Sequence, residues 1–397
     1  MDSPSKFGRS HILTRIKAFY FFFYAATGAV VPFLNLYLAR AGLSGTQIGI
    51  VTGVFPVVLI FAAPFWGILS DMTRWHHRIL HLALAATMPF LIGIAFSRNV
   101  ATLLFLMIGF AVFYAPVMPL IDNLALQILA DKPHGYGRLR VWGAIGWGVS
   151  PPLVGLLIDI AGIRIPFLFY LILMSVSVFM VFTIPRRQVS LRKPSRSGIG
   201  ALLSNTSWQL FLVCVFLVGI CSYILEHYFV LYLDGLGGSE SNFGISITMA
   251  SVSEIPIYFV AVLLIRRFGP RGLLLSAFGI YAVRAFLYAQ ISVPVWAIPA
   301  QLLHGPTFSA LWAGAVAYAS QHSGEELGAT AQSLFNSVFM GISASAGALI
   351  GGVLYEHLGL VQTFRICGLL SLFGFFAFLF LGGGDSRNVR LFRKRPP

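Results

Sequence analysis

Long apolar stretches separated by short polar loops constrain this chain more than any other feature. A helix needs about 20 predominantly apolar residues to cross the hydrocarbon core of a bilayer. The stretches show no alternation of period two, and backbone groups in lipid must be satisfied within the segment, so we expect helices rather than barrel strands. Twelve such crossings are expected, at residues 17–39, 46–69, 79–97, 101–129, 141–161, 165–184, 207–233, 243–265, 271–291, 295–319, 329–354 and 361–382.

The small number of charged residues excludes a soluble protein. Charged residues make up 10% of the chain and hydrophobic residues 57%, whereas a soluble domain carries about 25% charged residues. So few charges cannot cover a water-facing surface, and the 36 Phe and 14 Tyr residues exclude a disordered chain. The sequence therefore predicts an all-α membrane protein with twelve transmembrane helices in a lipid bilayer.

The formal net charge of +14 has two interpretations, which are nucleic-acid binding and the excess of basic residues in cytoplasmic loops. The bases lie in short loops and do not form one basic face, so we expect no nucleic-acid partner. Of the 27 Lys and Arg residues, 22 fall in the two termini, the central loop and the loops on the same side, while four fall on the other side. We therefore expect a multi-pass protein of the cell membrane with both termini in the cytoplasm.

One long polar segment, residues 185–206, interrupts the apolar stretches near the middle of the chain. It is rich in Arg, Ser and Pro, and we interpret it as a cytoplasmic linker. The predicted organisation is an N-terminal six-helix half at residues 1–184, the linker at 185–206, and a C-terminal six-helix half with a basic cytoplasmic tail at 207–397.

The two predicted halves repeat a short motif. The fifth crossing ends in G-x-x-x-D-x-x-G at residues 155–162, and the eleventh ends in G-x-x-x-E-x-x-G at residues 352–359, 197 residues later. A parallel repeat of two membrane-embedded halves is typical of secondary transporters. The alternative is a coincidence between two glycine-rich helix ends.

Motifs of common enzyme classes are absent from the sequence, including H-E-x-x-H, G-x-S-x-G and the Walker loop. The three cysteines, Cys214, Cys221 and Cys367, lie in apolar stretches and lack the spacing of metal ligands. We therefore expect no enzymatic activity, no disulfide, no metal site and no cofactor.

The loop after the second crossing carries a recognisable charge pattern. Gly67, Asp71 and Arg74, followed by Arg78, resemble the G-x-x-x-D-x-x-G-R motif of the major facilitator superfamily, although the second glycine of that motif is missing. The resemblance implies the major facilitator fold, with two pseudo-symmetric six-helix halves, and a cytoplasmic gate built from these four residues. The alternative is simple positive-inside charge.

A finer resemblance lies in crossings 4 and 5. Asp122, and Arg140 and Trp147 in the run that begins G-R-x-R, match the pattern of the sugar/proton symporter branch that contains lactose permease. The resemblance implies that Asp122 and Arg140 hold substrate hydroxyls and that Trp147 stacks on a sugar ring. Asn123 is a weaker candidate for substrate binding. Trp147 has the alternative role of a packing residue, and Asn123 that of a hydrogen bond between helices.

The buried charged residues of the second half match the proton-coupling set of the same branch. These are Glu254, Arg284 and His304, with Glu226 as a further acid. The branch has a carboxylate one helical turn after the histidine, where this chain has Thr307, so we expect the proton on Glu254 first and on Glu226 second. His304 is also a candidate for substrate binding. A charge at mid-bilayer costs about 2.5–3.5 kcal/mol, so a buried charge is expected to have a partner or a function. The alternative to proton coupling is a structural ion pair between Arg284 and Glu254.

Together these features predict a proton-coupled importer of a small hydroxylated solute, with a sugar or glycoside as the expected substrate, working by alternating access as a monomer. The amino-acid sequence of crossings 8–11 also resembles that of permeases for phenylpropionate-type acids. The alternatives are therefore an aromatic-acid or nucleoside permease, an uncoupled facilitator, an exporter, or a non-transporting membrane receptor of the same fold.

Overall fold

The computed structural model describes residues 6–129, 136–184 and 204–381, and in these ranges the regular structure is entirely helical. The first group of helices comprises α1 (Lys6–Val30), η1 (Val31–Phe33), α2 (Leu34–Arg40), α3 (Gly45–Thr73), α4 (His76–Phe96), α5 (Val100–Tyr114), α6 (Val117–Ile128), α7 (Tyr136–Ala161) and α8 (Ile165–Thr183). The second comprises α10 (Thr206–His227), α11 (Phe229–Gly235), α12 (Glu240–Tyr288), η3 (Pro294–Trp296), α13 (Ala297–Ala300), η4 (Gln301–Leu303), η5 (Gly305–Ser309), α14 (Ala310–Asn336), η6 (Ser337–Ser343) and α15 (Ala344–Leu381).

Nine helical segments of the described chain are long and apolar enough to cross a membrane. Two of them are pairs of crossings joined at a sharp turn, since α12 is interrupted at Gly269 and α15 at Gly359, with φ of 72° and 75°. Only glycine adopts positive φ without steric strain, so these two glycines allow the chain to reverse. With both pairs divided, and with the short helices from Pro294 into α14 included, the described part contains the predicted twelve crossings.

Several crossings are broken rather than continuous. The first is interrupted by η1, where Pro32 removes a backbone donor, and the seventh is interrupted at Tyr228 between α10 and α11. The Asn35 amide nitrogen donates to the carbonyl oxygen of His227 at 3.0 Å. The two breaks, one in each half of the chain, are therefore linked to each other directly.

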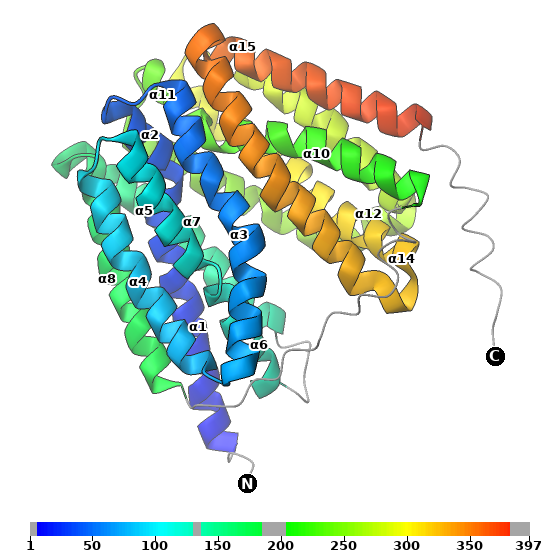
Figure 1. Ribbon diagram of the computed structural model, residues 1–397. Helices are drawn as coiled ribbons and strands as arrows, with labels where there is room; N and C mark the ends of the chain where they lie inside the picture. The colour runs from blue at the N-terminus through cyan, green and yellow to red at the C-terminus, as the bar shows by residue number, and fades with distance from the viewer. Residues whose placement is uncertain (1–5, 130–135, 185–203, 382–397) are drawn as a thin grey trace, which may run out of the picture.

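The helices form two groups, α1–α8 and α10–α15, which lie beside each other (Figure 1). The buried side chains of the first group make one hydrophobic cluster that includes Phe19 and Phe23. A second cluster around Trp208 fills the other group and also takes in Phe33 and Val154 from the first. Each group therefore has its own core, and residues near η1 and the end of α7 are buried in the core of the other group.

We call the end of the bundle where α3 and α12 begin the distal end, and the end where α1 begins the terminal end. The helix pairs α3–α15 and α7–α12 join the two groups. A Cβ atom at Gly45 would meet the carbonyl oxygen of Gly352, and one at Gly244 would meet the Pro151 carbonyl. Small residues let helix backbones approach closely in membranes. From this contact α3 and α15 diverge toward the terminal end (Figure 1).

Candidate functional site

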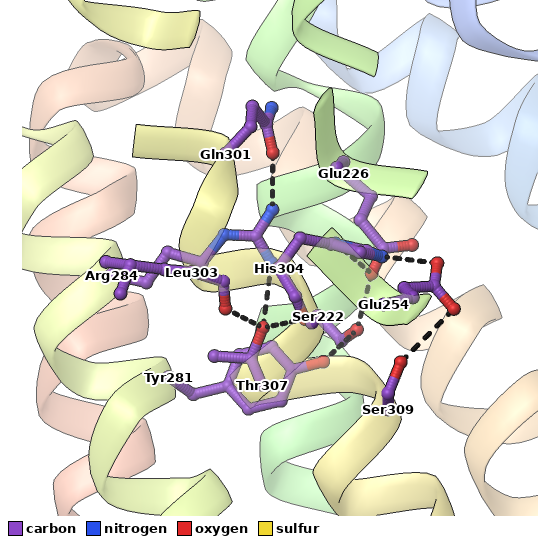
Figure 2. A network of polar contacts seen from close by, with 12 residues as sticks. Ser222, Glu226, Glu254, Tyr281, Arg284, Gln301, Leu303, His304, Thr307 and Ser309 are labelled. Atoms are coloured by element: carbon purple, nitrogen blue, oxygen red, sulfur yellow. Dashed lines mark hydrogen bonds and ion pairs between the residues drawn. The ribbon is translucent and has the colours of Figure 1, made fainter. Parts of the chain in front are cut away.

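Polar side chains from four crossings meet inside the second group of helices (Figure 2). Glu226 comes from α10, Glu254 and Arg284 from the two halves of α12, and His304 from the turn before η5. The structure therefore brings together all four residues that the sequence suggests for proton coupling.

His304 lies between the two carboxylates. Its Nε2 atom is 3.3 Å from Glu254 Oε1, and its Nδ1 atom is 4.0 Å from Glu226 Oε1. The residue is 8% exposed, and Nδ1 is a buried atom without a hydrogen-bond partner. The ring stacks on Phe308 with centroids 5.4 Å apart. The imidazole is thus held in a fixed position with one nitrogen bonded and the other facing a second acid.

Hydroxyl groups hold each carboxylate in place. Ser222 donates to Glu226 Oε1 at 3.0 Å and is itself 2.9 Å from the Tyr281 hydroxyl. Ser309 donates to Glu254 Oε2 at 3.2 Å. Ser309 thus leaves Glu254 Oε1 for the imidazole, while Glu226 Oε1 both accepts from Ser222 and faces Nδ1 of His304. The three titratable groups therefore form a row.

Arg284 is 1% exposed, and its guanidinium is bound by neutral groups. It donates to the Tyr288 hydroxyl at 2.8 Å, to Thr307 Oγ1 at 3.1 Å and to Gln301 Oε1 at 3.0 Å. Five N–H donors in a planar fork suit such a ring of acceptors. The side chain that takes the place of the acid in the related symporters, Thr307, is therefore a ligand of Arg284.

The ion pair between Arg284 and Glu254, which is the structural alternative to a coupling role, is not found among the described residues. Within the described part of the chain, the ion-pair partner of Glu254 is His304. The tenth crossing lies between the two charges, because its Gln301 accepts from Arg284 while its His304 reaches Glu254.

Gly305 sets the distance between the tenth crossing and α12. A Cβ atom here would collide with the carbonyl oxygen of Ser253, and the Gly305 backbone nitrogen donates to Ser253 Oγ at 2.8 Å. The chain from Gly305 to Ser309 forms one turn of π-helix, an element that often marks functional sites. Glu254, the residue after Ser253, is thereby brought next to His304.

The first group of helices contains the predicted substrate pair. Arg140 lies 3.5 Å from both carboxylate oxygens of Asp122, which also accepts from the Tyr20 hydroxyl at 2.5 Å. The guanidinium lies over the rings of Tyr20 and Tyr24, at 5.8 and 5.4 Å from their centroids. The side chains of Asp122 and Arg140 are 27% and 40% exposed, so this pair is accessible in a way that Arg284 is not.

The other two substrate candidates of the first group make fewer described contacts. Trp147 is half-buried, and its backbone packs against Gly28. Asn123 is also half-buried. Among the described residues neither side chain takes part in a hydrogen bond or ring contact, and their roles in substrate binding stay predictions.

The predicted gate residues lie at the terminal end, where α3 stops. Gly67 is within α3, Arg74 ends the helix with φ of 57°, and Arg78 lies 5.1 Å from the Trp75 ring. Asp71 is exposed, and in the described part of the chain no hydrogen bond or ion pair joins it to either arginine. The terminal end is therefore not held closed by this cluster in the structure.

Sequence reasoning did not identify several residues of the network, among them Ser222, Tyr281 and Tyr288. Serine and tyrosine occur throughout the crossings, so their presence alone carries little information. The usable signal is the spacing of four residues between Ser222 and Glu226, and between Arg284 and Tyr288, which places each pair on one helix face.

Comparison with known proteins gives relatives over most of the chain. The chain is 29% identical over 378 residues to the maltose permease of Geobacillus stearothermophilus, covering 94% of this chain and 96% of that protein. It is 29% identical over 364 residues to a probable 3-phenylpropionic acid transporter of Escherichia coli K12, covering 89% and 93%. The crystal structure of the nucleoside transporter NupG superposes with a TM-score of 0.82 at 16% identity, covering 97% and 100%.

These relatives are transporters rather than enzymes, and the shared fold accounts for the arrangement of the twelve crossings. The profile described as "MFS_1 like family" matches residues 13–366. The match spans both groups of helices and includes every candidate residue described above. This multi-pass membrane protein therefore belongs to the MFS_1 like family of major facilitator transporters.

Proposed function

We propose that this transporter couples the uptake of a small hydroxylated solute, a sugar or glycoside, to the entry of a proton by alternating access. The observation that carries the proposal is the row formed by Glu226, His304 and Glu254, with an imidazole between two carboxylates.

A count of charges explains why this row takes up a proton. With neutral His304, the two glutamates and Arg284 leave one excess negative charge inside the membrane, which is unfavourable. A neutral imidazole donates from only one ring nitrogen, whereas the imidazolium donates from both. One added proton on the imidazole, rather than on Glu254 or Glu226 as the sequence suggests, therefore neutralises the network and gives Glu226 a second donor beside Ser222. Movement of α12 against the tenth crossing would separate Glu254 from His304 and release the proton.

The pair of Asp122 and Arg140 supports a neutral, hydroxylated substrate. The negative charge of Asp122 and the positive charge of Arg140 cancel, so the pair does not require an ionic ligand. The carboxylate accepts from hydroxyl groups and the guanidinium donates to them. The relationship to a maltose permease supports the same substrate class. Trp147, Asn123 and His304 complete the proposed binding set.

An aromatic acid is the second candidate substrate. At 3.5 Å the contacts of Arg140 with Asp122 are long, which leaves guanidinium donors free for a carboxylate. The rings of Tyr20 and Tyr24 beside Arg140 would accept an aromatic group. The relationship to a probable 3-phenylpropionic acid transporter supports this alternative.

The orientation in the membrane is part of the proposal. We place the protein in the plasma membrane as a monomer, with both termini and the terminal end in the cytoplasm. The distribution of Lys and Arg among the loops and the bacterial origin of the relatives support this. Gly67, Asp71, Arg74 and Arg78 then form a cytoplasmic gate that pairs when the distal end opens.

Proton flux into proteoliposomes tests the proposal. The vesicles contain a trapped pH dye and receive maltose, other sugars, nucleosides or 3-phenylpropionate in turn. We expect acidification of the lumen with a sugar and none with the other classes. Acidification with 3-phenylpropionate alone would favour the second candidate. Equilibration of a labelled sugar without a change in pH would contradict proton coupling.

A further inference from the structure

Two carboxylates at the distal end make contacts between the groups of helices that the proposed function does not use. The first is Glu356, near the end of the eleventh crossing. Its Oε2 atom accepts from Ser44 Oγ and from the Thr46 backbone nitrogen, both at 2.8 Å. Ser44 is the N-cap residue of α3. A carboxylate of the second group therefore caps a helix of the first.

The second carboxylate is Asp159, near the end of α7. Its Oδ1 atom accepts from the Glu240 backbone nitrogen at 3.0 Å, and its Oδ2 atom accepts from the Ser241 backbone nitrogen at 3.1 Å and from the Ser241 hydroxyl. Glu240 is the first residue of α12 and follows the N-cap Ser239. A carboxylate of the first group therefore caps a helix of the second.

The two contacts are related by the internal repeat. Asp159 and Glu356 are the acids of the motifs at 155–162 and 352–359, 197 residues apart. One helical turn before each acid is a glycine in close contact with the partner helix, since a Cβ atom at Gly155 would meet the Glu240 carbonyl and one at Gly352 the Gly45 carbonyl. Glycine brings the helices together, and the acid then reaches the N-terminus beside it.

Each contact satisfies donors that have no partner within their own helix. The first N–H groups of a helix are unpaired, and the helix dipole favours a negative charge at that end. Both acids are supplied by the opposite group of helices. Neither bond can survive if the groups separate at the distal end, and the freed N–H groups then lose their acceptor.

We propose that Asp159 and Glu356 are a pair of equivalent latches that hold the distal end closed and that both open once in every transport cycle. The inference rests on the alternating access of the proposed function, but on neither its substrate nor its proton coupling. Arg40 also joins the groups at this end through Asp234 and Glu240. The side chains of Arg40 and Asp234 are 37% and 34% exposed, and ion pairs at the surface contribute little to stability.

Distance measurements between spin labels test the latches. Labels on Arg98→Cys and Gln290→Cys report the separation of the groups at the distal end, because both residues are exposed and lie in loops there. The three native cysteines are buried and accessible to label only poorly. The full chain is measured in lipid nanodiscs without substrate, so the readout requires no transport.

We expect Asp159→Ala and Glu356→Ala each to raise the ratio of distal-open to distal-closed molecules by between about 2-fold and 30-fold, the range for loss of a helix cap. Alanine is compatible with the helices that carry both acids. The double variant should show the product of the two effects. Asp159→Asn and Glu356→Gln, which keep an acceptor but remove the charge, should give smaller shifts and serve where an alanine variant folds poorly.

Asp234→Ala is the matched control, since it removes a carboxylate that joins the groups at the same end without capping a helix. We expect this control to leave the distance distribution unchanged. Unchanged distances in both latch variants would overturn the proposal, as would an equal shift in the control. The two proposals can fail separately. If the latch variants open the distal end but the parent protein shows no proton flux, the latches are supported and the proton coupling is contradicted.

Discussion

His304 is the residue on which the proposed coupling depends. We predict that His304→Gln abolishes accumulation driven by a proton gradient and keeps equilibration of labelled solute, because glutamine still donates to Glu254 but takes up no proton. The measurement compares uptake into proteoliposomes with and without an imposed pH gradient. His357→Gln, a change of an exposed histidine outside the network, should behave as the parent. Gradient-driven accumulation by His304→Gln would show that the proton travels elsewhere.

Asp122 and Arg140 allow a separate prediction about substrate affinity. Loss of a hydrogen bond to a charged group costs about 1.5–3 kcal/mol, so Asp122→Ala should raise the KM for solute by about 10-fold to 150-fold. Arg140→Lys should also raise the KM, since lysine does not form a planar pair of bonds. Arg138→Lys, at the exposed neighbouring arginine, is the control. An unchanged KM in both Asp122→Ala and Arg140→Lys would remove the pair from the binding site.

At this scale the sequence predicts which charges meet but not how they pair. Placement of Glu226, Glu254, Arg284 and His304 in adjacent crossings is enough to expect one polar cluster. The rotation of each helix about its axis decides which atoms face each other, and hydropathy contains no such information. For that reason the sequence offers Glu254 as an alternative partner of Arg284, whereas in the structure Gln301 and Thr307 accept hydrogen bonds from it.

At the scale of the elements, close approach of helices depends on single glycines. We predict that Gly305→Val lowers the free energy of unfolding by about 1–3 kcal/mol, the cost of overpacking a close-packed site, and therefore lowers the melting temperature. The variant should also weaken proton coupling, because the added atoms push α12 away from the tenth crossing. Heating followed by size-exclusion chromatography measures the stability. Gly279→Ala is the control, since its Cβ atom meets nothing closer than 3.7 Å. Equal stability of both variants would contradict this packing argument.

The sequence predicts the crossings better than their interruptions. The expected stretch 46–69 corresponds to α3 (Gly45–Thr73), and 165–184 corresponds to α8 (Ile165–Thr183). Hydropathy measures length and apolarity, and both are the same in a straight and a broken crossing. The breaks at η1 and at Tyr228, and the short helices around His304, therefore follow from packing between helices that a single sequence does not display. The linker predicted at 185–206 lies almost entirely outside the described residues.

At the scale of the whole molecule, the two groups of helices are in contact at the distal end and diverge toward the terminal end (Figure 1). The predicted repeat at 155–162 and 352–359 is visible in the sequence, but its role in linking one group to the helix ends of the other requires the structure. In the proposed cycle, opening at the distal end breaks these contacts and the gate residues at the terminal end then pair. In the proposed coupling, one proton and one solute molecule cross the membrane together in each such conformational change.

The ratio of protons to solute molecules tests the central claim most directly. It is obtained from the membrane potential at which solute flux through the parent protein reverses in proteoliposomes, with maltose as the first neutral sugar and then any sugar that acidifies the lumen. The charge count at Glu226, Glu254, Arg284 and His304 predicts one proton for each solute molecule. A flux that reverses at the same solute gradient whatever the pH gradient and potential would contradict the account.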